Sequence, residues 1–296
     1  MVEVTCRTIQ ERHLLRPSPA FNEVVVGVLG RAQRRTGLLI HAVAFMSNHY
    51  HLLVSPESAQ QLAEFMGYLN GNLAKEAGRL HGWKDRLWSR RYQAISVTAE
   101  ESAQVGRLRY LLSHGCKEGL VQSPLQWPGV HAARALAQGV ALRGTWFDRT
   151  REYEARRQGK CVGEQDFAET EEVHLTPLPF WEALTEEQRR ELVWEMVRDI
   201  EREAEAGGRT QGQQVSGERS VVSQDPHSRP VQPKRSTAPL VHAGSCAARL
   251  AFVGAYRLFV GAFRAAAERL RAGDLGVRFP EGSFPPALPF VPVRAG

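Results

Sequence analysis

Two histidines one residue apart, His49 and His51, lie in a run of β-forming residues. In a strand, alternate side chains project to one face, so the two residues would lie about 6.5 to 7 Å apart at their Cα atoms. Histidine is the commonest protein ligand for divalent metal ions near neutral pH, and one ion could bind both rings. A His-x-His pair also occurs by chance, so it indicates a metal site only together with further residues.

A second pair of reactive residues, Tyr110 and His114, is four residues apart in a segment with helical periodicity. Such residues share a helix face, and Arg107 and Lys117 lie beside them. The apolar side of the predicted helix lies roughly opposite and consists of Val105, Leu108, Leu111 and Leu112. A tyrosine can act as a nucleophile if a nearby cation or base helps to remove its proton, because its ordinary pKa is about 10. The alternative is a half-buried, amphipathic tyrosine at the domain edge.

Basic and aromatic side chains alternate in the segment before a predicted strand at 92–97. They are Arg79, His81, Trp83, Lys84, Arg86, Trp88, Arg90 and Arg91. This combination can track a phosphate backbone and stack unpaired bases. We therefore expect DNA contacts from Arg86, Trp88, Arg90 and Arg91, and from Arg107 and Lys117. The alternative for Trp83 and Trp88 is packing under a solvated loop.

The elements that position these residues follow from hydrophobic periodicity and turn signals. Strands are predicted at 2–8, 38–46, 50–54 and 92–97, and helices at 22–37, 58–82 and 98–117. The helix starts are indicated by Asn22 and by two capping pairs, Ser58 with Gln61 and Thr98 with Glu101. The order β-α-β-β-α-β-α predicts an α+β fold, with a ferredoxin-like split β-α-β antiparallel sheet and helices on one face, followed by a mainly helical C-terminal extension.

The chain is expected to comprise a catalytic domain at 1–135, an extension and linker at 136–176, and a helical accessory region at 177–296. The accessory region contains predicted helices at 185–206 and 245–272, a polar stretch at 207–239 and a Pro-rich tail at 279–293. A basic loop with Arg229, Lys234 and Arg235 could grip a DNA stem, although such a run is more often a solvated linker. His227 and His242 are isolated and are not expected to be metal ligands.

Composition is that of a basic, globular protein. Its 38 Lys and Arg exceed its 32 Asp and Glu, giving a net charge of +6, as is typical of a protein that binds phosphate backbones. The four cysteines are scattered singly and indicate neither a zinc ribbon nor a disulfide framework, which fits a reducing cytoplasm. The apolar stretch at 250–263 is interrupted by Arg257 and is too short to span a bilayer, so no membrane contact is expected.

The segments "SNHYHLLV", "RLWSRRYQAI" and "RYLLSHGCKEGLV" together resemble the single-tyrosine HUH transposases, most closely the REP-associated tyrosine transposases. The resemblance covers roughly the first 130 residues, and the three motifs are specific jointly because they occur in order and at family-like spacing. It implies a nucleoid-associated enzyme of the cytoplasm that cuts and rejoins single-stranded or hairpin DNA, with Mg²⁺ or Mn²⁺ as cofactor and possible homodimers. By this resemblance Tyr110 is the nucleophile and forms a 5′-phosphotyrosine, and His49 and His51 bind the metal.

Three residues depart from the family's pattern. His114 stands where the family has a metal-coordinating Asn or Gln, and is a competent third ligand. Gly115 replaces a proline, and Lys117 replaces an arginine. These departures keep open an alternative, a domesticated and catalytically weak protein that binds hairpin DNA. A second alternative is a ferredoxin-like RNA-binding protein or a metal-dependent hydrolase that uses the histidines without a tyrosine intermediate.

Overall fold

A five-stranded sheet forms the centre of the computed structural model, which describes residues 1–211, 215–230 and 238–287 except for the side chains of 208–211. Its strands are β1 (Val2–Arg7), β2 (Leu39–Phe45), β3 (His49–Ser55), β4 (Gln93–Val97) and β7 (Val241–His242). Their spatial order is β2-β3-β1-β4-β7; β7 runs parallel to β4, and the other pairings are antiparallel. The first four strands confirm the predicted ferredoxin-like arrangement. The fifth, β7, was not predicted.

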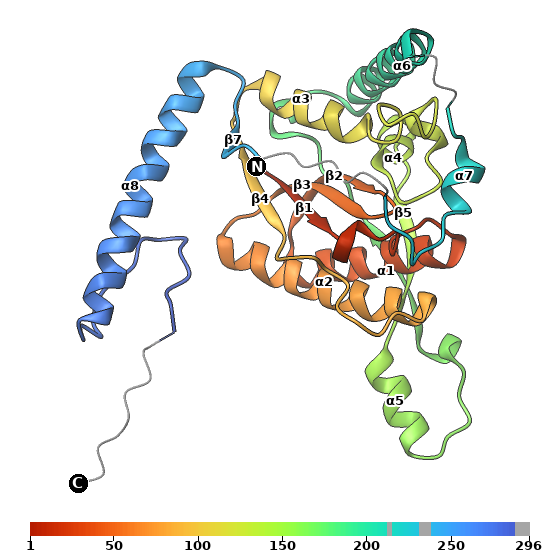
Figure 1. Ribbon diagram of the computed structural model, residues 1–296, viewed down its shortest axis with the longest axis horizontal. Helices are drawn as coiled ribbons and strands as arrows, with labels where there is room; N and C mark the ends of the chain where they lie inside the picture. The colour runs from red at the N-terminus through yellow and green to blue at the C-terminus, as the bar shows by residue number, and fades with distance from the viewer. Residues whose placement is uncertain (212–214, 231–237, 288–296) are drawn as a thin grey trace.

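Helices lie on both faces of this sheet (Figure 1). α1 (Pro19–Thr36) and α2 (Ala59–His81) cover one face, as expected, whereas α3 (Glu101–Leu112) and α4 (Ala132–Gln138) lie across the other. Side chains alternate along β3, so Tyr50 points to α2, where its hydroxyl donates to Asn70 Oδ1 at 2.6 Å. His49 and His51 point to the opposite face, which α3 partly covers.

The helix boundaries correct several predictions. α1 begins at Pro19 with Ser18 as its N-cap, rather than near Asn22. The Thr98 and Glu101 capping pair is wrong, because Glu100 precedes α3 and Thr98 donates to the Glu100 carboxylate instead. α3 ends at Leu112, not near Lys117. The physical reason lies in the positive φ angles of Gly115 (88°) and Gly119 (68°), which turn the chain out of the helical conformation.

The segment expected to be an extension and linker is an ordered hairpin that packs on α1. It contains β5 (Leu142–Phe147), α5 (Arg149–Arg157) and β6 (Ala168–Val173), with β5 and β6 antiparallel. The hairpin reaches α1 closely because Gly27 has no side chain; a Cβ there would lie 2.1 Å from the carbonyl carbon of Thr145. Arg149 also links the segment to α2, because its Nε and Nη2 atoms each donate to an oxygen of the Glu76 carboxylate at 2.7 Å.

The C-terminal part is mainly helical, as predicted. It contains α6 (Glu186–Gln211), α7 (Glu218–Val222) and α8 (Cys246–Arg271). Thr185 and Gln188 form a reciprocal cap at the start of α6. Elsewhere in the described part of the chain, short 3₁₀ helices lie at Ile9–Glu11, Pro124–Gln126, Glu164–Phe167 and Pro179–Trp181. Lys234, Arg235 and the end of the predicted tail lie outside the described residues.

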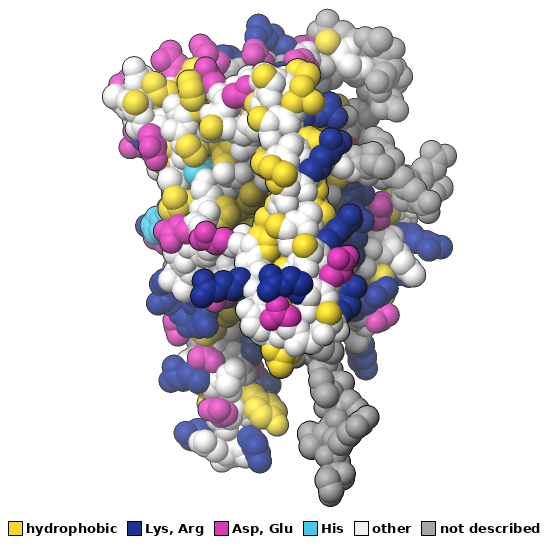
Figure 2. Space-filling view, turned by 90° about the vertical axis from the view of Figure 1, so that its left-hand side faces the viewer, with side chains coloured by type: hydrophobic (Ala, Val, Ile, Leu, Met, Phe, Trp, Pro, Cys, Tyr) yellow, Lys and Arg dark blue, Asp and Glu magenta, His cyan; other side chains and the backbone are white. Residues whose placement is uncertain are grey.

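α8 projects along the side of the molecule and leaves most of its surface open. In Figure 1 it stands apart from the sheet, and Figure 2 shows both apolar side chains and a row of basic ones on its open surface. Leu250 and Leu258 are 66% and 78% exposed. By length and composition alone α8 could cross a membrane, which a stretch limited to 250–263 could not. A single helix of this kind is only a weak indication of a membrane span.

Candidate active site

Three histidines from two separate segments meet on the α3 face of the sheet. His49 and His51 come from β3, and His114 from the turn that follows α3. The ring of His114 lies 4.4 Å from that of His51 and 5.8 Å from that of His49, centroid to centroid. One potential ligand atom of each residue lies within 4.8 Å of those of the other two. The predicted ligand set is therefore gathered in one place.

In each of the three histidine rings, Nδ1 donates a hydrogen bond to an oxygen atom. Nδ1 of His49 donates to Asn48 Oδ1 at 2.7 Å, Nδ1 of His51 to Glu3 Oε1 at 2.8 Å, and Nδ1 of His114 to the Tyr110 carbonyl at 2.9 Å. In a neutral imidazole the other nitrogen then carries the lone pair. The Nε2 atoms of all three rings are thus the available ligands, and such hydrogen bonds orient histidine ligands in metal sites.

The surroundings of His49 and His114 keep these two rings neutral. Desolvation, together with the nearby His51, Arg7 and Lys117, holds the pKa of His49 well below its usual range. Desolvation likewise holds the pKa of His114 far below its usual range, with contributions from His51 and Lys117. Neutral imidazole is the form that binds metal ions, so this donor set fits a divalent ion.

Tyr110 stands at the edge of the histidine cluster. Its ring centroid lies 4.7 Å from that of His114 and 5.9 Å from that of His51, and it meets both rings edge to face. The side chain projects from the last full turn of α3, opposite the buried Leu108 and Leu112, and the residue is 36% exposed. Its phenol is therefore beside the candidate metal site and open to solvent.

Two cations flank the Tyr110 ring. Lys117 Nζ lies 3.6 Å from the ring centroid, and Arg107 Cζ lies 3.9 Å from it. Positive charges at this range favour the binding of a phosphate. The arrangement shows that Lys117, although outside the helix that was expected to carry it, still lies beside Tyr110.

The turn after α3 brings His114 and Lys117 back to Tyr110. Gly115 has a φ of 88°, and a Cβ there would lie 2.9 Å from Cε3 of Trp127. Trp127 is buried and its indole nitrogen donates to the Phe45 carbonyl of β2 at 2.9 Å. A proline, whose φ is limited to about −65°, cannot adopt this backbone, so the glycine and the turn belong together.

Two site residues were missed by the sequence analysis, Glu3 and His242. Glu3 lies on the same face of β1 as the histidines and is buried, with Oε1 on His51 and Oε2 2.9 Å from His242 Nε2. Burial alone would raise the pKa of Glu3, but hydrogen bonds from His242 and His51 and the charges of His51 and Arg107 hold it well below its usual range. An acidic residue on the histidine face of a strand was the available signal for Glu3; nothing local indicated His242.

The predicted DNA contacts divide into two groups. Arg86, Arg90 and Arg91 are exposed, and their loop runs beside the end of β1, where Ser89 N donates to the Arg7 carbonyl. Arg7 pairs with His49, so this loop lies at the histidine end of the sheet. Trp88 instead packs against Tyr50, and its indole donates to the Asn70 carbonyl at 3.0 Å, as in the packing alternative.

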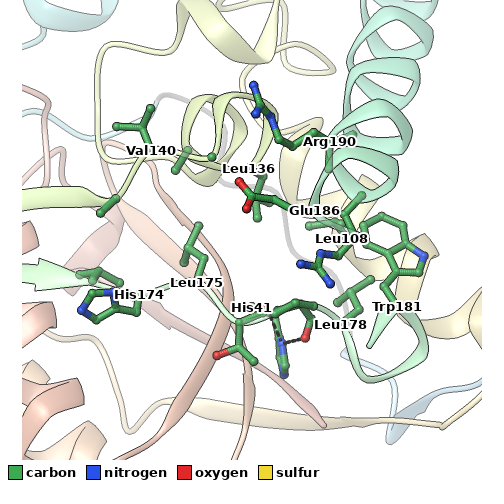
Figure 3. A pocket seen from close by; sticks show the side chains of 18 residues that line it. His41, Leu108, Leu136, Val140, His174, Leu175, Leu178, Trp181, Glu186 and Arg190 are labelled. Carbon is green, nitrogen blue, oxygen red and sulfur yellow. Dashed lines mark hydrogen bonds between the residues drawn. The ribbon is translucent and has the colours of Figure 1, made fainter. Parts of the chain in front are cut away.

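A separate pocket of about 310 Å³ lies behind α3, between α4, α6 and the end of β6 (Figure 3). Leu108 of α3, Leu136 and Trp181 contribute to its apolar lining. His41 lies at one side, where Nδ1 is shared between the Thr176 and Pro177 carbonyls at 3.0 and 2.8 Å. His49, His51, Tyr110 and His114 are not among the lining residues, so the candidate active site is on the other side of α3.

Comparisons with known proteins find similarity to transposases. The model of the family "Transposase IS200 like" matches residues 2–110, which include both β3 histidines and Tyr110. Among solved structures, a candidate transposase from Deinococcus radiodurans R1 is similar at 19% identity, covering 37% of this chain and 85% of that chain with a TM-score of 0.28. No curated protein sequence matches the chain. Over residues 2–110 the chain is similar to the IS200-like transposases.

Proposed function

We propose that this protein is a transposase that cuts and rejoins single-stranded DNA through a covalent bond between Tyr110 and a 5′-phosphate, with a divalent ion held by His49, His51 and His114. The observation that carries the proposal is the position of the Tyr110 ring, 4.7 Å from His114 and 5.9 Å from His51. A nucleophile and three imidazole ligands, from different elements, would thereby be within reach of one phosphate.

In the proposed reaction, the Tyr110 oxygen attacks the scissile phosphorus and the bond to the 3′ oxygen of the preceding nucleotide breaks. The products are a 5′-phosphotyrosine and a free 3′-hydroxyl; the phenol proton passes to solvent, to which Tyr110 is 36% exposed, and the departing 3′ oxygen takes up a proton from solvent. Attack by a 3′-hydroxyl on the phosphotyrosine reverses the step, so rejoining requires no ATP. A divalent ion on the three imidazoles would draw charge from a nonbridging phosphate oxygen and orient the phosphate for in-line attack.

The surrounding cations support binding of the DNA backbone. Lys117 lies over the Tyr110 ring, where it can pair with a phosphate bound beside the phenol. Arg86, Arg90 and Arg91 are exposed at the histidine end of the sheet and can contact phosphates further along the strand. Trp88 is not included among these contacts, because its indole is engaged in packing. We propose single strands and hairpin ends in the nucleoid as the substrates.

The ligand set indicates which ion the site favours. An Asn or Gln would supply an oxygen, whereas His114 supplies a third imidazole nitrogen. Nitrogen-rich sets bind Mn²⁺ and later transition metals better than Mg²⁺, which prefers oxygen ligands. We therefore propose Mn²⁺ as the more effective of the two ions.

The test is formation of a covalent protein–DNA adduct. End-labelled single-stranded hairpin DNA is incubated with the full chain and Mn²⁺, and the adduct is resolved by denaturing gel electrophoresis. We expect an adduct with the wild-type chain that is absent from Tyr110→Phe and His49→Ala. Tyr153→Phe is the matched control, because Tyr153 is an exposed tyrosine on α5 outside the site.

The alternatives predict other results. Hairpin binding without any adduct would support the catalytically weak binding protein and contradict the proposed enzyme. Cleavage that survives Tyr110→Phe but not His49→Ala would support a metal-dependent hydrolase without a tyrosine intermediate. An adduct that persists in Tyr110→Phe would exclude Tyr110 as the nucleophile.

A further inference from the structure

Four polar side chains in mutual contact link the strand β7 to the histidine cluster. They are His51, Glu3, His242 and Arg107. His51 Nδ1 lies 2.8 Å from Glu3 Oε1, Glu3 Oε2 lies 2.9 Å from His242 Nε2, and His242 Nδ1 lies 3.0 Å from a guanidinium nitrogen of Arg107. The same Arg107 nitrogen lies 3.2 Å from His242 Nε2 and 3.5 Å from Glu3 Oε2, so it contacts both His242 and Glu3. His51 Nδ1 donates to Glu3 Oε1, whereas His242 Nε2 and Arg107 both lie close to Oε2.

All four side chains are withdrawn from solvent. The side chains of Glu3 and His51 are 6% and 9% exposed, and those of His242 and Arg107 are 15% and 16% exposed. A buried carboxylate without partners is unfavourable, so Glu3 depends on its neighbours as much as His51 depends on Glu3. The four residues therefore form a largely buried polar network and not a chance contact between surface side chains.

Strand pairing brings the members together. Glu3 lies diagonally from His51 on adjacent strands, because Thr5 is the residue directly opposite His51. His242 arrives from the far end of the chain, because β7 pairs with β4 with Val97 opposite His242. The Thr98 amide donates to the His242 carbonyl at 3.0 Å, and Gly244 N donates to the Glu100 carboxylate at 2.8 Å, so β7 is held at both sides.

From this geometry we infer that Glu3 is a positioning residue for the metal ligand His51, and that the C-terminal strand, through His242, holds Glu3 in place. The inference rests on the proposed function, since it concerns the same metal site. A carboxylate on Nδ1 fixes both the tautomer and the orientation of the ring, so that Nε2 faces the ion, and it raises the basicity of Nε2.

The network also reaches the proposed nucleophile. Arg107, which donates to His242, has its guanidinium carbon 3.9 Å from the Tyr110 ring centroid and a nitrogen 3.5 Å from Glu3 Oε2. The position of the Arg107 guanidinium is consequently set by Glu3 and His242. Arg107 therefore interacts mainly with these two side chains and not with DNA phosphates. The accessory region thus contributes a side chain to the active centre, and residues 1–135 alone lack one member of it.

The inference is tested by metal binding, which does not depend on DNA or turnover. Free Mn²⁺ is measured by electron paramagnetic resonance during titration of the full chain, and Co²⁺ is used as a second probe because its visible absorption reports the ligand geometry. We expect Glu3→Gln to weaken Mn²⁺ binding by about 10- to 100-fold, the usual effect of removing a hydrogen-bonding partner behind a ligand. The Co²⁺ spectrum should change as well, which a merely structural role would not produce.

His242 variants test the second half of the inference. His242→Ala should weaken Mn²⁺ binding in the same direction but by less than Glu3→Gln, because Oε1 of Glu3 still holds His51. His242→Gln should restore much of the loss, since its amide N–H can replace Nε2–H as a donor to Oε2. If Glu3→Gln does not fold, the two His242 variants still test whether the network affects Mn²⁺ binding. Glu64→Gln and His174→Ala are the matched controls, as both residues are exposed and lie outside the network.

The outcomes separate the inference from the proposed function. The inference would be overturned if Glu3→Gln and His242→Ala folded, melted normally and bound Mn²⁺ with an affinity within about twofold of that of the wild-type chain. The proposed metal site would not be contradicted by that result. A wild-type chain that binds neither Mn²⁺ nor Co²⁺ would overturn both. Binding by the wild-type chain that is lost in His49→Ala and weakened in Glu3→Gln would support both.

Discussion

Replacing Gly27 with alanine tests the close contact between α1 and the β5–β6 hairpin. An added Cβ would lie 2.1 Å from the carbonyl carbon and oxygen of Thr145 and 2.5 Å from the amide nitrogen of Trp146. Ordinary contacts of a Cβ begin near 3.4 Å. All three obstructing atoms are backbone, so no side-chain rotation can relieve the clash. The helix and the hairpin must separate by about 1.3 Å, which disrupts their packing.

The expected free energy follows from two opposing effects. Alanine is a better helix former than glycine and stabilises a helix interior by about 0.5 to 1 kcal/mol. Overpacking of a close contact destabilises by about 1 to 3 kcal/mol, and a backbone obstruction places Gly27→Ala at the upper end. We therefore expect a net loss of about 2 kcal/mol in the free energy of unfolding, equivalent to a melting temperature lower by about 4 to 8 °C.

The assay is urea unfolding followed by tryptophan fluorescence, with thermal unfolding as a second measure. Gly67→Ala is the matched control, because Gly67 is exposed on α2 and an added Cβ there would have no neighbour within 4 Å. It should stabilise the chain by about 0.5 to 1 kcal/mol, opposite in sign to Gly27→Ala. If Gly27→Ala were as stable as the wild-type chain, or stabilised it as Gly67→Ala does, the close approach of α1 and β5 would be refuted.

Three further predictions follow from single contacts. Burial lowers the pKa of His131 to about 4, so the unfolded chain binds more protons than the folded chain between pH 6.5 and 4, and stability falls as the pH falls through this range. His131→Asn keeps an N-cap acceptor for α4 and should lose less stability than the wild-type chain between about pH 7 and pH 4, measured by urea unfolding at each pH; an equal loss would contradict this. Gly115→Ala should destabilise the chain by about 1 to 3 kcal/mol, because φ is positive and Trp127 obstructs the Cβ, whereas Gly71→Ala, with open space around it, should not. His114→Asn should raise the adduct yield with Mg²⁺ relative to Mn²⁺, measured with both ions on the same hairpin DNA, and an unchanged ratio would show that His114 does not bind the ion.

The local parts of the site could be read from the chain because they depend on short-range periodicity. His49 and His51 are two residues apart in a strand, so they share a face wherever the fold places it, whereas His114 lies beyond the end of α3 and meets Tyr110 through the turn that follows. The ferredoxin-like order of strands also follows from the alternation of strand and helix signals. The expected boundary of α3 was wrong, because the turn at Gly115 depends on packing against Trp127.

Tertiary structure alone decided the contacts made across strands. The pairing of β1 with β3 sets Glu3 behind His51, and the pairing of β7 with β4 carries His242 from the accessory region to Glu3. Nothing in the neighbourhood of His242 indicates such a partner, because the register between strands distant in sequence depends on the whole packed sheet. Local periodicity therefore determined which side chains could carry out the chemistry, and the packed fold determined which buried groups hold them in position.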